Sequence, residues 1–365
     1  MIHAGELIED LSACLKLAPY GIPESVINRQ IKNLQHSHLN PSSAMTATHS
    51  LAALVQDKLR FINQEKVEEL LRCEIYVVPL PLCVAYSKPK PKSDSIILGN
   101  GLLNLICACG YWAFFVESLP ESLDKHYPLE QFPRTSVRDA VPVFLFSLLY
   151  RHYCYGEPLP DMSRLIPNKI HEKVRHAIAG AATFILIHEL GHLRLGHLDN
   201  KNIRSMNVQL VVDEALSTYQ LQELEADEYV LNAILPEYRP LHSLWVNMAL
   251  NFHIQSEILL SHKSSEHPIS VNRLSYANEM CEGRLMDPAT YTRHLNTMGE
   301  KYNDLEEKNR RLKLRNTSPI LDHYSRTELL EILEQLNPFL EPEGYGLREA
   351  LYSDAPDWHT MLKVQ

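Results

Sequence analysis

Apolar residues recur at helical spacing over most of the chain, so the hydrophobic pattern predicts a mainly helical protein. Residues 1–73 predict three helical segments: one over 5–18, one after Pro23, and one from about 43 to 72. Glycine is scarce, which also favours helix. Further helices are predicted at 101–118, 136–153, 169–197, 208–234 and 239–262.

One stretch departs from the helical pattern. Residues 74–86 read EIYVVPLPLCVAY, rich in β-branched and aromatic side chains, but Pro79 and Pro81 limit this stretch to an edge strand or an extended segment. After a polar turn at 87–95, residues 95–101 predict a returning strand. The expected fold class is therefore α+β, mostly helical, with a small sheet and helical extensions at both ends.

These patterns predict three regions along the chain. Residues 1–73 form an N-terminal helical region, 74–285 the core, and 286–365 a C-terminal helical extension. Within the extension, a charged helix over 291–314 carries seam positions at alternating three- and four-residue spacing. Two interpretations remain open: a surface helix packed on the body, or a short coiled coil that joins two copies as a homodimer.

Charge and the longest apolar run narrow the function classes. With 35 basic and 45 acidic side chains, the formal charge is −10, which does not attract phosphate backbones and argues against a nucleic-acid partner. The longest apolar run, residues 102–116, spans 15 residues, whereas a membrane helix needs about 20. The N-terminus has no basic region typical of a signal peptide. We expect no transmembrane segment and a cytoplasmic location.

The most informative segment is GAATFILIHELGHLRLGH, residues 180–197, which contains an HExxH motif. His188 and His192 lie one helical turn apart on one face, so both imidazoles can bind the same metal ion. Zinc lowers the pKa of a bound water to about 7, and Glu189 is placed beside it to accept the proton. The motif predicts one Zn2+ ion, with Glu189 as general base.

A third ligand has to come from outside this motif. The metzincin pattern would need histidine at position 198, where this chain has Leu198. His197 follows His192 by five residues, which turns it about 140° away from the metal face of a continuous helix. We therefore expect His197 to be a surface or helix-end residue.

A second helix offers a better ligand, in the segment QLQELEADEYVLNAIL. Glu223 and Asp227 share an apolar stripe, where carboxylates are costly unless they bind a metal or pair with a cation. Glu225 belongs to another face, which we expect to be solvated. Glu223 is the predicted third ligand, and Asp227 is placed to accept the second N–H of a ligand histidine. The alternative is a buried salt bridge, with Arg273 as the partner.

HELGH followed by ELEAD on a second helix resembles the gluzincin zinc metallopeptidases with a Glu-x-x-x-Asp motif. These include the HtpX and CAAX-prenyl-protease type and the ImmA/IrrE type. The resemblance implies that the small sheet belongs to a zincin-like catalytic core. The segment SSEHPISVNRL also resembles the HPxxxxR segment of the HtpX-like group. This resemblance implies that His267 stabilises the tetrahedral intermediate and that Arg273 anchors the substrate or the ligand helix.

A chain of this design without spanning helices also resembles the phage-exclusion Lit-type peptidases, which implies cleavage of a translation factor during phage infection. The expected activity is zinc-dependent hydrolysis of a protein or peptide substrate, in phage defence or stress regulation. The extended segment near 74–99 would supply an edge strand for the substrate. Two other classes stay open: a regulatory zinc-binding protein without turnover, and a hydrolase of non-peptide amides. Glu189 favours the peptidase over a structural zinc site, which needs no general base.

Overall fold

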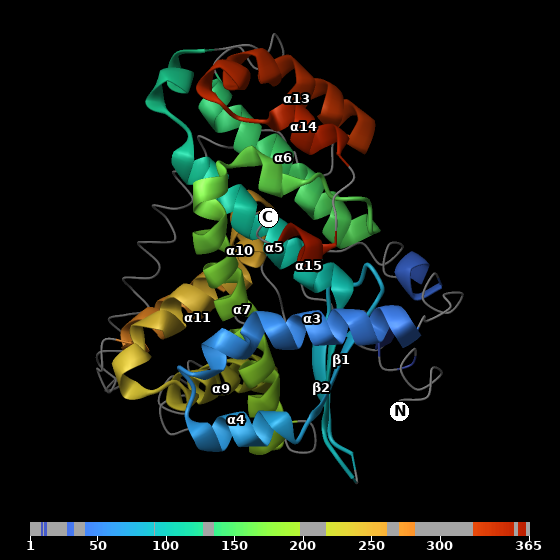
Figure 1. Cartoon of the computed structure of the whole chain (residues 1–365), viewed down its shortest axis with the longest axis vertical. Helices are drawn as coiled ribbons and strands as arrows, with labels where there is room; N and C mark the ends of the chain where they lie inside the picture. The colour runs from blue at the N-terminus through green and yellow to red at the C-terminus, as the bar shows by residue number, and fades with distance from the viewer. Residues whose placement is uncertain are drawn as a thin grey trace.

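The computed structural model is mostly helical, with one three-stranded sheet, which confirms the predicted α+β class (Figure 1). The predicted helix over 291–314, His267 and most of the first predicted helix lie outside the residues that the structure describes. The described residues are 9, 11–12, 28–32, 41–90, 92–126, 135–197, 217–260, 270–281, 324–353 and 357–362.

The sheet has the strand order β1-β3-β2. β3 (Ser95–Gly99) is the central strand, parallel to β1 (Glu74–Val78) and antiparallel to β2 (Ala85–Lys88). The predicted segment 74–86 is therefore divided between two strands. Pro79 and Pro81, which cannot donate to a strand ladder, lie in the connection between them.

The outer edge of β1 is covered by helix α3 (Pro41–Leu59), which crosses the sheet in Figure 1. The backbone N–H of Val77 donates to the hydroxyl of Thr48, 3.0 Å away. This contact gives a hydrogen-bond partner to a backbone N–H that would otherwise be unpaired at the edge of the sheet. β2, at the opposite edge, packs instead against α7 (Asn168–Leu195).

The single helix predicted from 43 to 72 is two helices. α3 ends at Leu59, and α4 (Gln64–Leu71) begins after Asn63, whose side chain accepts a backbone N–H of the first turn of α4. Asparagine is a preferred residue at this capping position, so a local signal for the break was present in the sequence.

Four long helices form the centre of the core and agree with the predicted ones. They are α5 (Asn100–Ser118), α6 (Val137–Tyr155), α7 and α10 (Pro240–Leu260). α7 has 28 residues and contacts α3, α5, α9 (Thr218–Ala233) and α10. It therefore links the sheet to the helical core.

Among the described residues, α5 is the one helix that is long and apolar enough to cross a membrane. Of its most apolar stretch, 67% is buried inside the protein. α5 packs against α6, α7 and α10. Such burial is the behaviour of a core helix.

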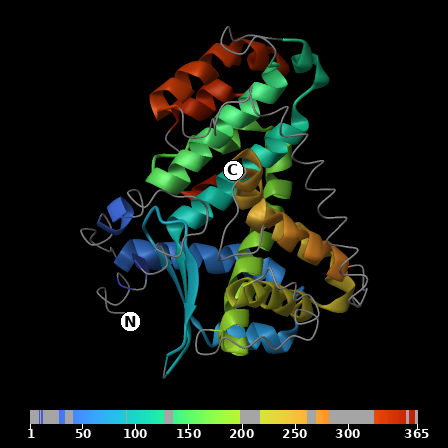
Figure 2. The ribbon, with the colours of Figure 1, turned by 180° about the vertical axis from the view of Figure 1, so that it is seen from behind.

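The C-terminal helices return to the body of the protein. α13 (Arg326–Leu340) packs on α6, and α14 (Leu347–Tyr352) packs on α13. α15 (Trp358–Met361) packs on α5, where the indole N–H of Trp358 donates to Asn100. In Figures 1 and 2, α13 and α14 lie at one end of the long axis, and α4 and α9 lie at the other.

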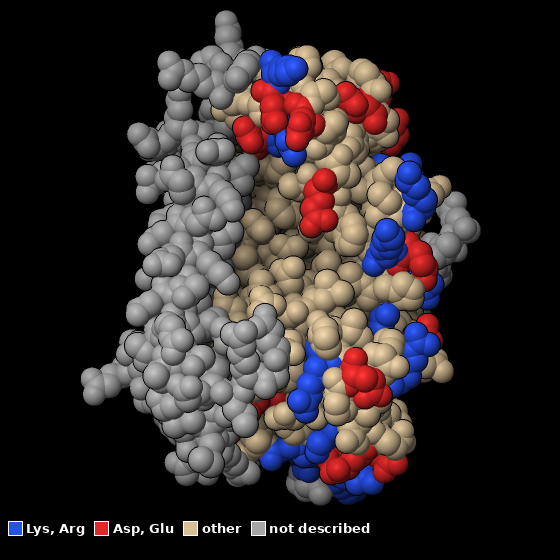
Figure 3. Space-filling model, turned by 90° about the vertical axis from the view of Figure 1, so that its left-hand side faces the viewer, with Lys and Arg blue, Asp and Glu red and all other residues tan. Residues whose placement is uncertain are grey.

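Figure 3 shows the face that lies on the left of Figure 1. Lys and Arg side chains lie beside Asp and Glu side chains toward both ends of its described surface. The middle of this surface is hollowed and largely uncharged. On this described face, the net charge of −10 is not gathered into a single acidic patch.

Candidate metal centre

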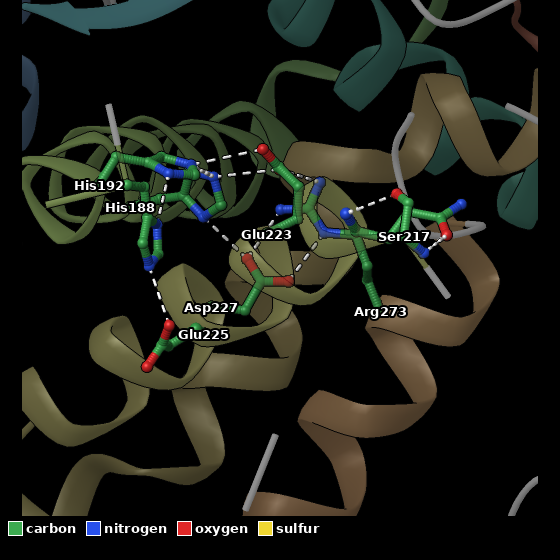
Figure 4. A network of polar contacts seen from close by, with 9 residues as sticks. His188, His192, Ser217, Glu223, Glu225, Asp227 and Arg273 are labelled. Carbon is green, nitrogen blue, oxygen red and sulfur yellow. Dashed lines mark hydrogen bonds and ion pairs between the residues drawn. The ribbon is translucent and has the colours of Figure 1, made fainter. Parts of the chain in front are cut away.

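Two helices bring three predicted residues together. α7 contributes His188 and His192, and α9 contributes Glu223; in Figure 4 their side chains point toward one another. The two histidine Nε2 atoms lie 3.1 Å apart. One carboxylate oxygen of Glu223 lies 3.4 Å from His188 Nε2, and the other lies 3.4 Å from His192 Nε2.

The distance between the two Nε2 atoms, and the distance from each Nε2 atom to its nearer Glu223 oxygen, are each close to the distance between two ligands of a tetrahedral zinc ion. Ligand atoms at about 2.0–2.1 Å from zinc, at tetrahedral angles, lie about 3.3 Å from one another. Within the described ranges, these three side chains form the one group of histidine, cysteine and carboxylate ligands close enough to hold a metal ion. Two histidines and one glutamate also match the ligand types of catalytic zinc sites, which keep a fourth position open.

A carboxylate lies directly behind His188. When Nε2 of His188 faces the metal position, its Nδ1 carries the proton and donates to Asp227, 2.9 Å away. Arg273 donates to both oxygens of Asp227, at 2.7 and 2.8 Å, and its third nitrogen lies 3.3 Å from Glu223. Asp227 therefore has both predicted roles: it accepts the N–H of His188 and forms a buried salt bridge with Arg273.

The electrostatics of this group favour charged forms. Burial opposes ionisation of Asp227, but Arg273 and His188 lower the pKa of Asp227 to about 2. Burial likewise opposes protonation of His188, but Asp227 and Glu223 raise its pKa to about 9. The surroundings of His188 therefore favour a positive charge at this position, which is also what a bound metal ion would supply.

Glu189 lies on α7 between the two histidines in sequence and is 7% exposed. Its side chain leaves the helix about 100° from that of His188, so it lies beside the ligand face. His267 lies outside the described residues, so the structure says nothing about its position.

One expectation about a neighbouring residue is wrong, and one of two open positions for another is confirmed. Glu225, expected to be solvated, is 2% exposed, because α9 is covered by α7 on one side and by α11 (Ser270–Cys281) on another. His197 does lie at the end of α7, but it is 7% exposed and is not a surface residue.

The position of His197 results from the way α7 ends. Gly196 has a φ of 72°, in the left-handed region that favours glycine, and this turn stops the helix. The backbone N–H of His197 then donates to the carbonyl of His192 at 3.1 Å. The 140° rotation expected for a continuous helix therefore does not apply. A glycine near the end of an apolar helical pattern was the signal that could have shown this.

The last turn of α7 is tied to its surroundings by ion pairs. Arg194 donates to Glu69 on α4 at 2.9 Å and to Asp94, next to β3, at 2.7 Å. Tyr229 on α9 donates to the same carboxylate oxygen of Glu69 at 3.1 Å. These contacts hold both helices that carry the candidate ligands in fixed relative positions.

The start of α9 is stabilised by a capping box. The hydroxyl of Ser217 accepts the backbone N–H of Gln220, and the side chain of Gln220 accepts the backbone N–H of Ser217 (Figure 4). Such a cap satisfies two backbone donors that a helix start leaves open. It fixes the first turn of the helix that carries Glu223.

The family model for Peptidase U49 matches residues 150–290, fewer than half of the 365 residues. This span includes α7, α9, α10 and α11, and with them every described residue of the candidate metal centre. The match supports a peptidase. No curated protein and no solved structure matches the chain.

Proposed function

We propose that this chain is a zinc-dependent endopeptidase that hydrolyses peptide bonds of a protein substrate. One observation carries the proposal: the side chains of His188, His192 and Glu223, from α7 and α9, lie close enough together to hold one metal ion, within the span that matches Peptidase U49. The HExxH motif supplies an acid–base group beside them.

His188, His192 and Glu223 would hold one Zn2+ ion. When bound, zinc polarises the carbonyl of the scissile bond and lowers the pKa of water to about 7. The carboxylate of Glu189 takes a proton from the attacking water and passes it to the nitrogen of the leaving amine. Asp227 holds the proton on Nδ1 of His188, which leaves Nε2 free to act as a ligand.

The sheet suggests where a peptide would bind. β2 is an edge strand that packs against α7, whereas the outer edge of β1 is already used by α3. An extended substrate can add to an exposed strand edge through main-chain hydrogen bonds. The proposed substrate strand is therefore β2, which narrows the predicted segment 74–99 to Ala85–Lys88.

The proposed setting of the activity rests on the Lit-type resemblance, and the family match supports its peptidase part. The proposed role is phage defence in the cytoplasm, by cleavage of a host protein, with a translation factor as the substrate class to be examined first. Pulsed expression followed by mass spectrometry of newly formed peptide termini would identify the cleaved protein.

The deciding variant is Glu189→Gln, which keeps the shape of the side chain and cannot accept the proton of the water. The variant is expected to bind zinc and fold like wild type, while hydrolysis falls by about 10²- to 10⁴-fold. Zinc content, circular dichroism and cleavage products of both proteins, expressed at matched levels, are the measurements.

The same comparison separates the alternatives. A regulatory zinc-binding protein without turnover predicts that Glu189→Gln keeps the full cellular effect with zinc bound. A hydrolase of non-peptide amides predicts that the variant loses activity although wild type creates no new peptide termini. Either result would replace the endopeptidase proposal.

A further inference from the structure

His192, which is half-buried, lies at one end of a chain of three side chains whose other two members are buried. Its Nδ1 atom lies 2.9 Å from Nδ1 of His197, and Nε2 of His197 lies 2.9 Å from a carboxylate oxygen of Glu225. The side chains of His197 and Glu225 are each 2% exposed. Water therefore has little access to the contact between His197 and Glu225, and a buried polar group of this kind needs a hydrogen-bond partner within the protein.

One arrangement of protons satisfies every contact. If Nε2 of His192 is the atom that faces the metal position, the proton of this ring is on Nδ1 and is donated to Nδ1 of His197. His197, accepting at Nδ1, then carries its own proton on Nε2 and donates it to Glu225. The chain thus favours the one tautomer of His192 that can bind a metal through Nε2.

Local structure explains how the chain forms. The left-handed turn at Gly196 brings His197 back beside His192. On α9, Glu223 and Glu225 are two residues apart; Glu223 reaches the histidine Nε2 atoms, whereas Glu225 reaches the ligand group only through His197. Figure 4 shows Glu225 on a different side of His188 and His192 from Arg273.

We infer that His197 and Glu225 are positioning residues that hold His192 in the ring orientation and tautomer required of a zinc ligand. The inference rests on the proposed zinc function. His192 is then supported by an imidazole–carboxylate pair, as His188 is supported by Asp227 and Arg273. The buried carboxylate of Asp227 supports His188 directly. The buried carboxylate of Glu225 supports His192 through the ring of His197.

The first measurement is zinc affinity of the full chain, by competition with a chromogenic chelator. Glu225→Ala leaves His197 without its acceptor and is expected to weaken zinc binding by about 10- to 100-fold. Glu225→Gln keeps an acceptor oxygen and is expected to weaken it less. Ser325→Ala is the control: it removes the capping box of α13, which packs on α6 and not on α7 or α9, so it is expected to lower the melting temperature and leave zinc affinity unchanged.

A double variant separates positioning from plain structural support. In His197→Phe with Glu225→Met, no charge is left buried without a partner, so folding stability is expected to recover relative to His197→Phe alone. His192 still lacks an acceptor for its Nδ1 proton, so zinc affinity is expected to stay about 10- to 100-fold below wild type. A purely structural pair predicts recovery of both properties.

The outcomes distinguish this inference from the proposed function. If wild type binds zinc and cleaves its substrate while all folded variants bind zinc as tightly as wild type, the positioning role is wrong and the peptidase proposal stands. Recovery of zinc affinity in the double variant overturns the positioning role as well. If wild type itself binds no zinc, both proposals fall together.

Discussion

Gly180 on α7 lies directly against the indole ring of Trp245 on α10: a Cβ atom added at Gly180 would lie 2.2 Å from Trp245 Cδ1. Trp245 is 2% exposed, so the ring has little room to move away. The missing side chain lets the two helices approach closely, eight residues before His188. This contact helps to set the position of the HExxH segment.

Gly180→Ala is expected to destabilise the protein by about 1–3 kcal/mol, because overpacking a rigid core forces the neighbours to shift. In a helix without this contact, the same change would stabilise by up to about 1 kcal/mol. Urea unfolding of wild type and variant measures the difference. In a Trp245→Leu background the sign is expected to reverse, and an unchanged destabilisation there would contradict the packing explanation.

Stability is expected to fall in mild acid because of His242 on α10, which is 1% exposed. Burial lowers the pKa of His242 to about 4, although nearby Asp227 opposes this shift. Between pH 6.5 and 4 the unfolded chain binds a proton at this site and the folded protein does not, so stability decreases as pH falls.

The expected loss from His242 between pH 7.5 and pH 5 is about 2 kcal/mol, at about 1.4 kcal/mol per pH unit. His242→Phe, which keeps a ring and cannot titrate, is expected to lack this part of the pH dependence. Urea unfolding of both metal-free proteins at the two pH values is the measurement. Parallel losses in the two proteins would show that His242 does not cause the effect.

Glu223 and Glu225, both on α9, are expected to differ in their effect on metal content. Glu223→Ala removes a proposed ligand, so the purified variant should carry little zinc. Glu225→Ala should retain zinc with reduced affinity, although Glu225 is the more deeply buried of the two. Asp227→Asn should also weaken binding by about 10- to 100-fold. Elemental analysis after dialysis against a weak chelator tests the order, and a zinc-free Glu225→Ala beside a zinc-loaded Glu223→Ala would reverse the assignment.

Zinc is expected to stabilise the folded protein. At a free zinc concentration about 100-fold above Kd, the free energy of unfolding should rise by about 2.7 kcal/mol. Thermal unfolding with and without a chelator measures the gain. Glu223→Ala should show no gain, and an equal gain in this variant would place the stabilising zinc at another site.

The sequence predicted the long core helices and the centre of the candidate site, because in each case a single pattern, helical periodicity or residue spacing, was sufficient. The helical repeats of 101–118 and 239–262 closely match α5 and α10. His188 and His192, four residues apart, had to share a helix face, and the apolar stripe selected Glu223 and Asp227. The geometry brings all four together.

The residues that the sequence missed depend on tertiary packing and on one turn. Glu225 was assigned to solvent because the helical pattern of α9 was read as having one polar face, whereas neighbouring helices cover that face. His197 is expected at the surface or at a helix end, turned away from His192, because the predicted helix over 169–197 continues past Gly196, where α7 ends. Hydrophobic periodicity describes a single regular helix. It does not show which faces of that helix are buried by neighbouring elements, or which direction the chain takes after the helix ends.

The candidate ligands come from two helices, and Glu223 follows His192 by 31 residues along the chain. An ion held by both would close this stretch into a loop, as a disulfide does, and so restrict the unfolded chain. By chain-entropy arithmetic, a permanent link over this length contributes roughly 4 kcal/mol. Loss of the ion would then release this restraint together with the reaction centre. A molecule without bound zinc would lack the proposed activity, and it would also be less stable and so easier to degrade. The supply of zinc would then control the lifetime of the protein in the cell.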